Sequence, residues 1–236
     1  MKKIFALLSL VCFQIGFSQV SSSFFNDADQ FFKANVTNGR VHYGKIKANP
    51  AKLNALVETI ASTKVDASNK SEYQAFYINA YNLSVINGIV NKYPVAQPTA
   101  IPGFFDAKKV NIAGTKMTLN DIENKMLRKV FPKEARFHFV LVCAGLGCPP
   151  IINAAYKPAT LEAQLSKQTT LAMDNPKFIR VNGSKVKISQ IFEWYKKDFT
   201  QFGSIVEYIN KYKTEKLPAK AKTSFYTYDW TLNDAK

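Results

Sequence analysis

A long helix predicted from Ser71 to about Asn91 constrains the fold of this chain more than any other feature. Ser71 and Gln74 make the capping-box pattern that begins many helices. At about 100° per residue, the apolar positions gather into one wide arc, made of Ala75, Phe76, Leu83, Ile86, Ile89 and Val90. A helix with such a face is stable only when other elements pack against that face.

The elements predicted around this helix are shorter helices and isolated strands. Helices are expected near residues 24–34, 120–130, 160–173, 190–199 and 204–212, hairpins near 110–119 and 178–188, and single strands at 136–143 and 223–230. The strands do not alternate regularly with helices, so a doubly wound parallel sheet is not expected. We predict the α+β class, as a single helix-rich domain with short hairpins and a central buried strand.

The N-terminus has the pattern of a secretory signal peptide. Two lysines precede an apolar run from Ile4 to Phe17, which is too short for a membrane span, and Gly16 and Ser18 suit a cleavage site. We therefore expect residues 1–18 to be a signal peptide and residues 19–236 to form one domain. The predicted location is periplasmic or secreted, with no transmembrane segment after cleavage.

The chain is strongly basic, with a formal net charge of +15. Only four of its 32 cationic residues are arginine, the side chain that nucleic-acid readers favour, so no nucleic-acid partner is expected. The positive charge indicates either an ordinary solvated surface or a surface that binds an anionic component of the cell envelope. The predicted partners are such a component, or a small peptide or ester substrate, and no cofactor is expected.

Two helices place polar side chains where the pattern requires burial. Asn79 and Asn82 fall inside the apolar arc of the long helix, and Glu123 lies near the middle of the apolar stripe of residues 120–130. The amides are expected either to hold a loop or neighbouring helix or to line a site and orient a catalytic base. The carboxylate is expected either in a salt bridge, with Arg128 or Arg136 as partner, or in a functional site.

The segment from Arg136 to Pro150 holds the remaining candidate site residues. His138 lies in the predicted buried strand, Cys143 ends that strand, and Cys148 follows a loop bracketed by glycines. Pro149 can begin a helix, which would place Cys148 at a helix N-terminus, where a thiolate is favoured. Three alternatives stay open: a disulfide or inert thiols, a weak metal site without a fourth ligand, and a thiol nucleophile served by His138.

Five blocks of sequence in order resemble one protein family. They are Tyr77–Asn82, Leu119–Glu123, His138–Phe139 with Cys143 and Cys148–Pro149, Ile191–Tyr195 with Asp198–Phe199, and Tyr228–Asn233. Together they are similar to the family known as domain of unknown function 547 (DUF547), over about residues 41–233. The resemblance implies kinship without an activity. Many members of the family have histidine after the Ile-Glu pair, where this chain has Asn124.

The residues themselves suggest a function. Cys148 as preferred nucleophile, Cys143 as its alternate, His138 as base, and Glu123, Asn79 or Asn82 as orienting groups are the parts of a papain-type or transglutaminase-type site. We therefore predict a thiol-dependent hydrolase or acyl transferase acting on an envelope amide or ester, with no cofactor-binding or metal-ligating residues. The alternative is a non-catalytic scaffold or binding protein with a Cys143–Cys148 disulfide and a basic surface.

Overall fold

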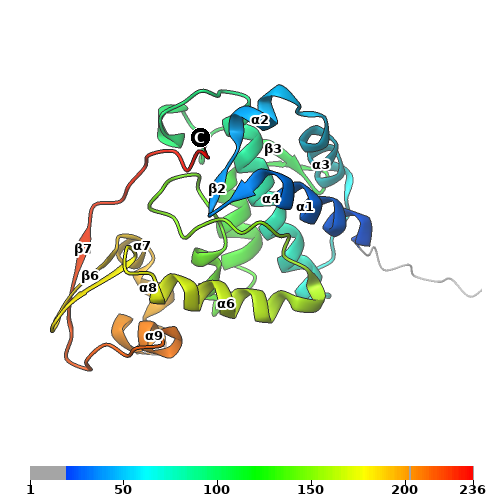
Figure 1. Cartoon of the computed structure of the whole chain (residues 1–236). Coiled ribbons are helices and arrows are strands. Elements are labelled where there is room, and N and C mark those ends of the chain that lie inside the picture. The colour runs from blue at the N-terminus through cyan, green and yellow to red at the C-terminus, as the bar shows by residue number, and fades with distance from the viewer. Residues whose placement is uncertain (1–19, 202, 236) are drawn as a thin grey trace, which may run out of the picture.

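The computed structural model describes residues 20–201 and 203–235, so the predicted signal peptide lies outside the described residues. Helices form most of the fold (Figure 1). The α-helices are α1 (Ser22–Asn35), α2 (Tyr43–Ala48), α3 (Ala51–Ser62), α4 (Lys70–Val90), α5 (Leu119–Asp121), α6 (Leu161–Asp174), α7 (Ile191–Trp194), α8 (Lys196–Phe199) and α9 (Ile205–Tyr212). Three short 3₁₀-helices, η1 (Pro98–Ala100), η3 (Ala135–Phe139) and η4 (Pro158–Thr160), and a π-helix, η2 (Ile122–Arg128), complete the helical elements described.

The strands form three small sheets. β1 (Val36–Thr37) pairs with β2 (Arg40–Val41), and β3 (Val110–Ile112) pairs with β4 (Thr115–Met117), both antiparallel. β5 (Ile179–Asn182) and β6 (Lys185–Ser189) form an antiparallel hairpin, and β7 (Lys222–Tyr226) adds to β6 in parallel. The predicted α+β class is confirmed.

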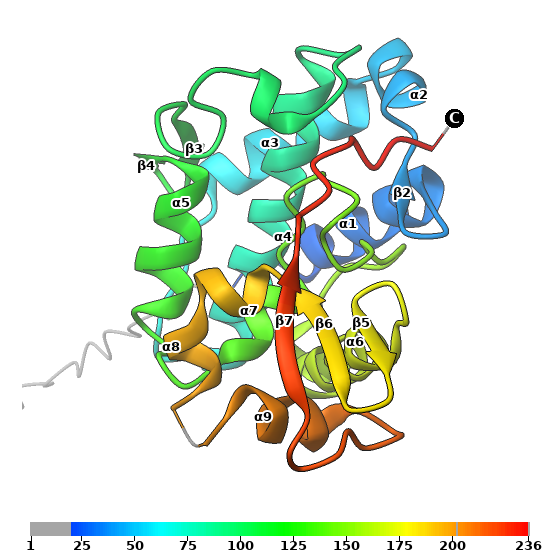
Figure 2. The ribbon, with the colours of Figure 1, turned by 90° about the vertical axis from the view of Figure 1, so that its left-hand side faces the viewer.

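The predicted long helix is α4, and it lies at the centre of the larger of two hydrophobic cores. Asn69 caps α4 through its side chain, and nearly every residue from Tyr73 to Val90 is buried. The larger core joins α4 to the apolar sides of α1, α2 and α3. The smaller core joins α6, α7 and α9 to the inner face of the β5–β6–β7 sheet. Figure 2 shows β7 and the segment after it running from this sheet toward the helices α1–α4.

The central buried strand predicted at residues 136–143 is wrong. Ala135–Phe139 is the 3₁₀-helix η3, and residues 140–143 are irregular. The run is apolar because it is buried on all sides, and burial of that kind gives no periodicity that separates a strand from a short helix. Its backbone finds partners outside any sheet: the N–H groups of Val140 and Leu141 both donate to the carbonyl of Phe137.

The helix predicted at residues 120–130 is present, but most of it is a π-helix instead of an α-helix. Thr118 caps it in a capping box with Asp121, and the turns from Ile122 to Arg128 are π-helical. A π-helix widens the turn, so the projection at about 100° per residue does not hold there. Glu123 is nevertheless buried, at 8 % exposed, as expected. No helix in the described part of the chain is long and apolar enough to cross a membrane.

Candidate functional site

The two cysteines lie at opposite ends of a loop that folds back on itself. Ala144 turns the chain with a left-handed φ of 66°. A Cβ on Gly147 would lie 2.9 Å from the Tyr228 ring, so the close packing of the loop at that position requires glycine. The N–H groups of Leu146 and Gly147 donate to carbonyls of the C-terminal segment, at 2.8 and 2.7 Å. The fold-back brings Cys148 Sγ within 3.0 Å of the Cys143 backbone nitrogen, which donates to it.

The two sulfur atoms and the Tyr228 hydroxyl form one cluster. The hydroxyl oxygen lies 3.0 Å from Cys143 Sγ and 2.9 Å from Cys148 Sγ, and both cysteines are free thiols in this structure. Hydrogen bonds with the Cys148 thiol, the Tyr228 hydroxyl and the Gly145 N–H lower the pKa of Cys143, although desolvation opposes them, and the Tyr228 hydroxyl donates to Cys148 Sγ. Desolvation and the neighbouring Cys143 raise the pKa of Cys148 well above its ordinary value. Cys143 is therefore the better thiolate of the pair.

The helix start expected at Cys148 is wrong. Residues 148–157 are irregular, and the next helical element after them is η4 at Pro158. The second proline, Pro150, restricts the backbone of Pro149 to extended conformations, which disfavours a helix at that point. The lowered pKa thus belongs to Cys143, and it comes from three hydrogen-bond partners instead of a helix N-terminus.

His138 is held by a carboxylate from a distant part of the chain. Its Nε2 lies 2.8 Å from Asp198 Oδ2, which also accepts from Arg128 Nε at 2.8 Å. Burial acts to raise the pKa of Asp198, but the hydrogen bonds from His138 and Arg128 outweigh it and hold that pKa well below its usual range. Asp198 therefore stays charged and fixes the imidazole with Nδ1 on its free side.

Glu123 lies on that free side of the imidazole. Its Oε1 is 3.9 Å from His138 Nδ1, and the Tyr195 hydroxyl hydrogen-bonds to the same carboxylate. The expected salt bridge of Glu123 is not formed with either arginine named as its partner. Arg128 pairs instead with Asp198, and Arg136 pairs with two glutamates, Glu134 and Glu162.

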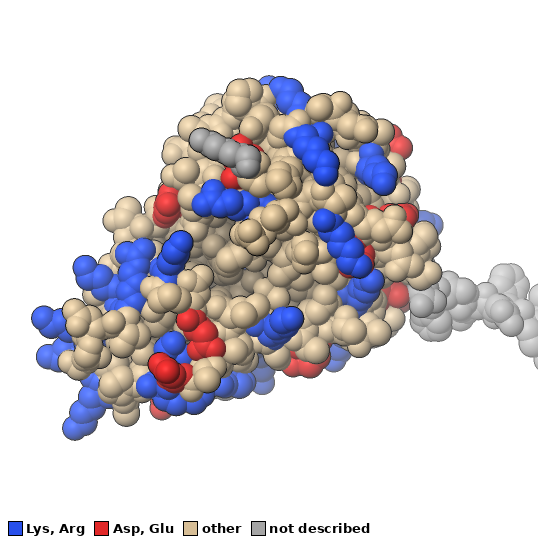
Figure 3. All heavy atoms as spheres, in the orientation of Figure 1, with Lys and Arg blue, Asp and Glu red and all other residues tan. Residues whose placement is uncertain are grey.

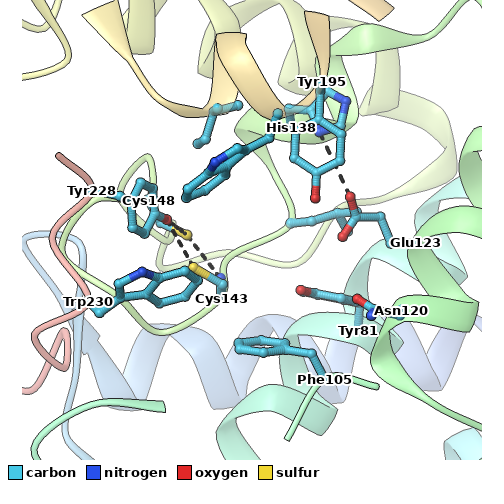
Figure 4. Close-up of a pocket in the computed structure, with 13 residues that line it drawn as sticks. Tyr81, Phe105, Asn120, Glu123, His138, Cys143, Cys148, Tyr195, Tyr228 and Trp230 are labelled. Carbon is cyan, nitrogen blue, oxygen red and sulfur yellow. Dashed lines mark hydrogen bonds and ion pairs between the residues drawn. The ribbon is translucent and has the colours of Figure 1, made fainter. Parts of the chain in front are cut away.

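These side chains surround one cavity of about 320 Å³, shown in Figure 4. Cys143 and Tyr228 lie on one side of it, and His138, Glu123 and Tyr195 lie on another. The thirteen lining residues are Tyr81, Phe105, Asn120, Glu123, His138, Leu141, Cys143, Cys148, Ile191, Trp194, Tyr195, Tyr228 and Trp230. The geometry thus brings together four of the six predicted site residues, around a space that a small group can enter.

The other two predicted site residues lie outside the cavity, deep in α4. Asn79 binds the backbone N–H and carbonyl of Tyr156. Asn82 accepts from the N–H of Val142 and donates to the carbonyl of Val140. Each amide satisfies the backbone of an irregular segment, which is the first of the two roles considered for them. Asn82 has the closer connection to the site, since the segment it holds leads directly into Cys143.

A comparison with protein-family models finds one family that matches the segment containing much of this site. Residues 65–171 match the DUF547 family, described as "Protein of unknown function, DUF547". The resemblance to DUF547 expected from the sequence is confirmed over these residues. The DUF547 match includes α4, η2, η3 and both cysteines, while Asp198, Tyr195 and Tyr228 lie C-terminal to it. No curated protein and no solved structure matches the chain.

Several residues that line the cavity, and Asp198 behind His138, had no role in the sequence-based hypothesis. Asp198, Tyr195, Tyr228 and Trp230 are present in the sequence blocks that resemble DUF547, and this was their only signal. Tyr81 lies in the long helix, where its apolar neighbours concealed it. Among the described residues, no three His, Cys, Asp or Glu side chains are grouped closely enough to hold a metal ion.

Proposed function

We propose that this protein is a thiol-dependent hydrolase or acyl transferase that acts on an amide or ester, with Cys143 as the nucleophile. The observation that carries the proposal is the cavity shared by a thiol of lowered pKa and a histidine oriented by Asp198. A thiolate, an oriented base and a space between them are the parts that acyl transfer requires. Cys148 acts as a positioning residue, because its thiol donates to the Cys143 sulfur.

The reaction follows from where these groups lie. The Cys143 thiolate attacks the acyl carbon, a carbon–sulfur bond forms, and the carbonyl electron pair moves to the oxygen. Collapse of this intermediate breaks the bond to the amide nitrogen or ester oxygen, and His138, which carries on Nδ1 the proton that Cys143 lost, gives it to that leaving group. Water or an acceptor nucleophile then loses a proton to His138 and attacks the thioester, the carbon–sulfur bond breaks, and the thiolate is regenerated.

His138 makes no hydrogen bond to either sulfur within the described part of the chain. Its part in the proposed reaction is therefore to exchange protons with the leaving group and with water across the cavity, while Cys148, Tyr228 and Gly145 stabilise the thiolate. Burial raises the pKa of Tyr81 well above its ordinary value, so its hydroxyl stays protonated. Tyr81 lines the same cavity and is the candidate donor to the developing oxyanion.

The test is direct acylation by an activated ester, such as p-nitrophenyl acetate, followed by mass spectrometry of the intact protein and its peptides. We expect an acetyl adduct on Cys143, no adduct in Cys143→Ala, and a longer-lived adduct in His138→Ala because water is no longer activated. A Cys143 that stays unmodified while the free thiol is present would overturn the proposal.

The scaffold alternative predicts a different chemical state. If the two cysteines are joined in protein isolated from its own compartment, and reduction releases no acylation activity, the binding or scaffold role takes the place of the enzyme. Thiol alkylation before and after reductant, read by mass, distinguishes the two states.

The proposed place of action is the periplasm or the cell exterior, and the N-terminal pattern of residues 1–18 supports it. N-terminal sequencing of the mature protein is expected to find Gln19 first. Recovery of Met1 from the purified protein would contradict export by cleavage.

The proposed partner of the basic surface is an anionic envelope component, and the outer face of the β5–β6–β7 sheet supports it. Arg180, Lys185, Lys187 and Lys222 are exposed and share that face by the strand register. The three strands contain no Asp or Glu. Such a face attracts anions over a distance set by the ionic strength.

A further inference from the structure

The cavity differs in charge from the rest of the molecule. The chain carries 32 Lys and Arg residues and a net charge of +15, yet none of the thirteen lining residues is Lys or Arg. Glu123 contributes a carboxylate to the lining. A cavity selected for an anionic group would use the cations that this chain has in excess, so its lining points away from an anionic ligand.

Six of the thirteen lining residues are Phe, Tyr or Trp. Trp194, Tyr228 and Trp230 form a cluster, with centroids 5.0 Å apart for Trp194 and Tyr228 and 4.7 Å apart for Tyr228 and Trp230. Phe105 contacts Trp230 at 6.2 Å between centroids, and Tyr195 lies on the opposite side, beside Glu123. Trp194 stacks on Trp230, with centroids 6.2 Å apart, and is still 47 % exposed, so a large indole is held at the cavity with part of its surface uncovered.

The Glu123 carboxylate is buried and forms no salt bridge with Lys or Arg among the described residues, although Arg128 is close enough to interact with it electrostatically. The nearby Asp198 differs, since Arg128 and His138 both bind it. Glu123 accepts from the Tyr195 hydroxyl and lies 3.9 Å from His138 Nδ1. A buried carboxylate without a paired cation costs free energy, and a cationic ligand group would offset that cost.

We propose that the cavity binds an alkylammonium group, seated on the faces of Trp194 and Trp230 and within reach of the Glu123 carboxylate. Aromatic faces attract cations through their quadrupole, and a carboxylate adds a direct charge interaction. The substrate class that follows is an amide or ester whose acyl or leaving group carries an amine or quaternary ammonium. This substrate class rests on the proposed thiol chemistry, whereas the cation site itself depends only on the lining residues.

The chain offers a selective reporter, because both of its tryptophans line this cavity. Intrinsic tryptophan fluorescence of the Cys143→Ala protein is titrated with choline and with 3,3-dimethylbutanol, its uncharged isostere. We expect choline to quench and to bind about tenfold more tightly or better, since a cation–π contact and an adjacent carboxylate act only on the charged probe. Equal affinities for the two probes, or no response to either, would overturn the proposal.

Matched variants identify the source of the preference. Glu123→Gln keeps the shape and the hydrogen-bond acceptor for Tyr195, so we expect it to lower choline affinity about tenfold and leave the isostere unchanged. Glu215→Gln removes an exposed carboxylate outside the cavity and should change neither affinity. Trp194→Leu should weaken choline binding with Trp230 as the remaining reporter. Retention of full choline preference in both Glu123→Gln and Trp194→Leu would contradict the site.

The outcomes separate this inference from the proposed function. Acylation of Cys143 without any choline preference would leave the thiol enzyme standing and refute the cation site. Choline preference without acylation would leave the cation site standing in a binding protein.

Discussion

At the scale of single residues, the contrast between the two cysteines decides which of them the proposal takes as the nucleophile. Both sulfurs accept hydrogen bonds: Cys143 Sγ from the Cys148 thiol and the Gly145 N–H, and Cys148 Sγ from the Cys143 N–H and the Tyr228 hydroxyl. They differ because desolvation and the neighbouring Cys143 keep the proton on Cys148. Stabilising one thiolate with the other thiol lowers one pKa and raises the other. The proposal therefore places the nucleophile at Cys143, although the proline after Cys148 directed the sequence-based prediction to Cys148.

Alkylation by iodoacetamide across pH tests this assignment. The pKa of Cys143 is lowered, so its thiolate should form, and its alkylation rate should level off, at lower pH than for an ordinary cysteine. Cys148 should react only slowly, because its pKa is raised. Tyr228→Phe removes one hydrogen-bond partner of Cys143 and should move the Cys143 profile to higher pH. Faster labelling of Cys148 than of Cys143 would reverse the assignment.

Asp198 orients the His138 ring through the hydrogen bond at Nε2. Asp198→Asn removes the charge that binds Nε2, and we expect acyl turnover to fall about 100-fold, the contribution typical of a general acid or base. The pH profile of turnover should also shift, which a purely structural role would not cause. Asp106→Asn, an exposed carboxylate, is the matched control and should leave turnover unchanged.

At the scale of elements, α4 supports the site by holding irregular backbone with its buried amides. Asn82 is 2 % exposed and makes two hydrogen bonds to residues 140–142. Asn82→Ala leaves both backbone groups unsatisfied, so we expect the free energy of unfolding to fall by about 2–3 kcal/mol. Urea unfolding measures the loss, and Asn54→Ala on the exposed side of α3 is the control.

The same variants test whether Asn82 positions the site. Asn79 holds Tyr156, which does not line the cavity, so Asn79→Ala should cost similar stability while leaving the alkylation profile of Cys143 unchanged. Asn82→Ala should change that profile, because the segment it holds ends at Cys143. Identical alkylation of the two variants would show that the role of Asn82 is only structural.

The elements that the sequence predicted well are those with a clear period. The long helix α4 and the hairpins β3–β4 and β5–β6 follow from spacing and turn residues, and the structure confirms them. Residues 136–143 were misjudged because a run buried on all sides has no distinguishing period. The π-helix containing Glu123 also depends on tertiary packing, which overrides local propensity.

The site was predicted in part, for a related reason. His138, Cys143 and Cys148 are close in sequence, and Glu123 stood out as a charge in an apolar stripe. Asp198 reaches His138 across 60 residues, and Tyr228 reaches Cys143 across 85. Neither is anomalous in its own segment, so only the folded arrangement reveals the contact.

At the scale of the whole molecule, the C-terminal segment joins the two cores at the site. Cys148 packs against both cores, and the backbone of residues 229–233 bonds to the cysteine loop. Tyr228 enters the cavity from the same segment. Motion of one core relative to the other would therefore change the cluster of sulfurs and hydroxyl.

Charge is unevenly distributed at this scale. Lys and Arg gather on the lobe that contains the β5–β6–β7 sheet, at the left of Figure 3. Strand register places Lys185 opposite Lys222 and Arg180 opposite Lys187. Like charges directly opposite each other destabilise a sheet, so this arrangement has a cost that an anionic partner would relieve.

Lys222→Thr tests whether this face gives up stability for anion binding, because the change should raise stability and weaken binding. Removing one charge of the Lys185–Lys222 pair should raise the free energy of unfolding by about 0.2–1 kcal/mol at low salt, and by less at high salt as screening weakens the repulsion. The same change should reduce retention on a column of an acidic polysaccharide. Lys116→Thr is the matched control, because Lys116 is an exposed strand lysine opposite Asn111 and has no like charge to relieve. If Lys222→Thr and Lys116→Thr behave alike in both measurements, the sheet face is an ordinary solvated surface and the anionic partner must bind elsewhere or not at all.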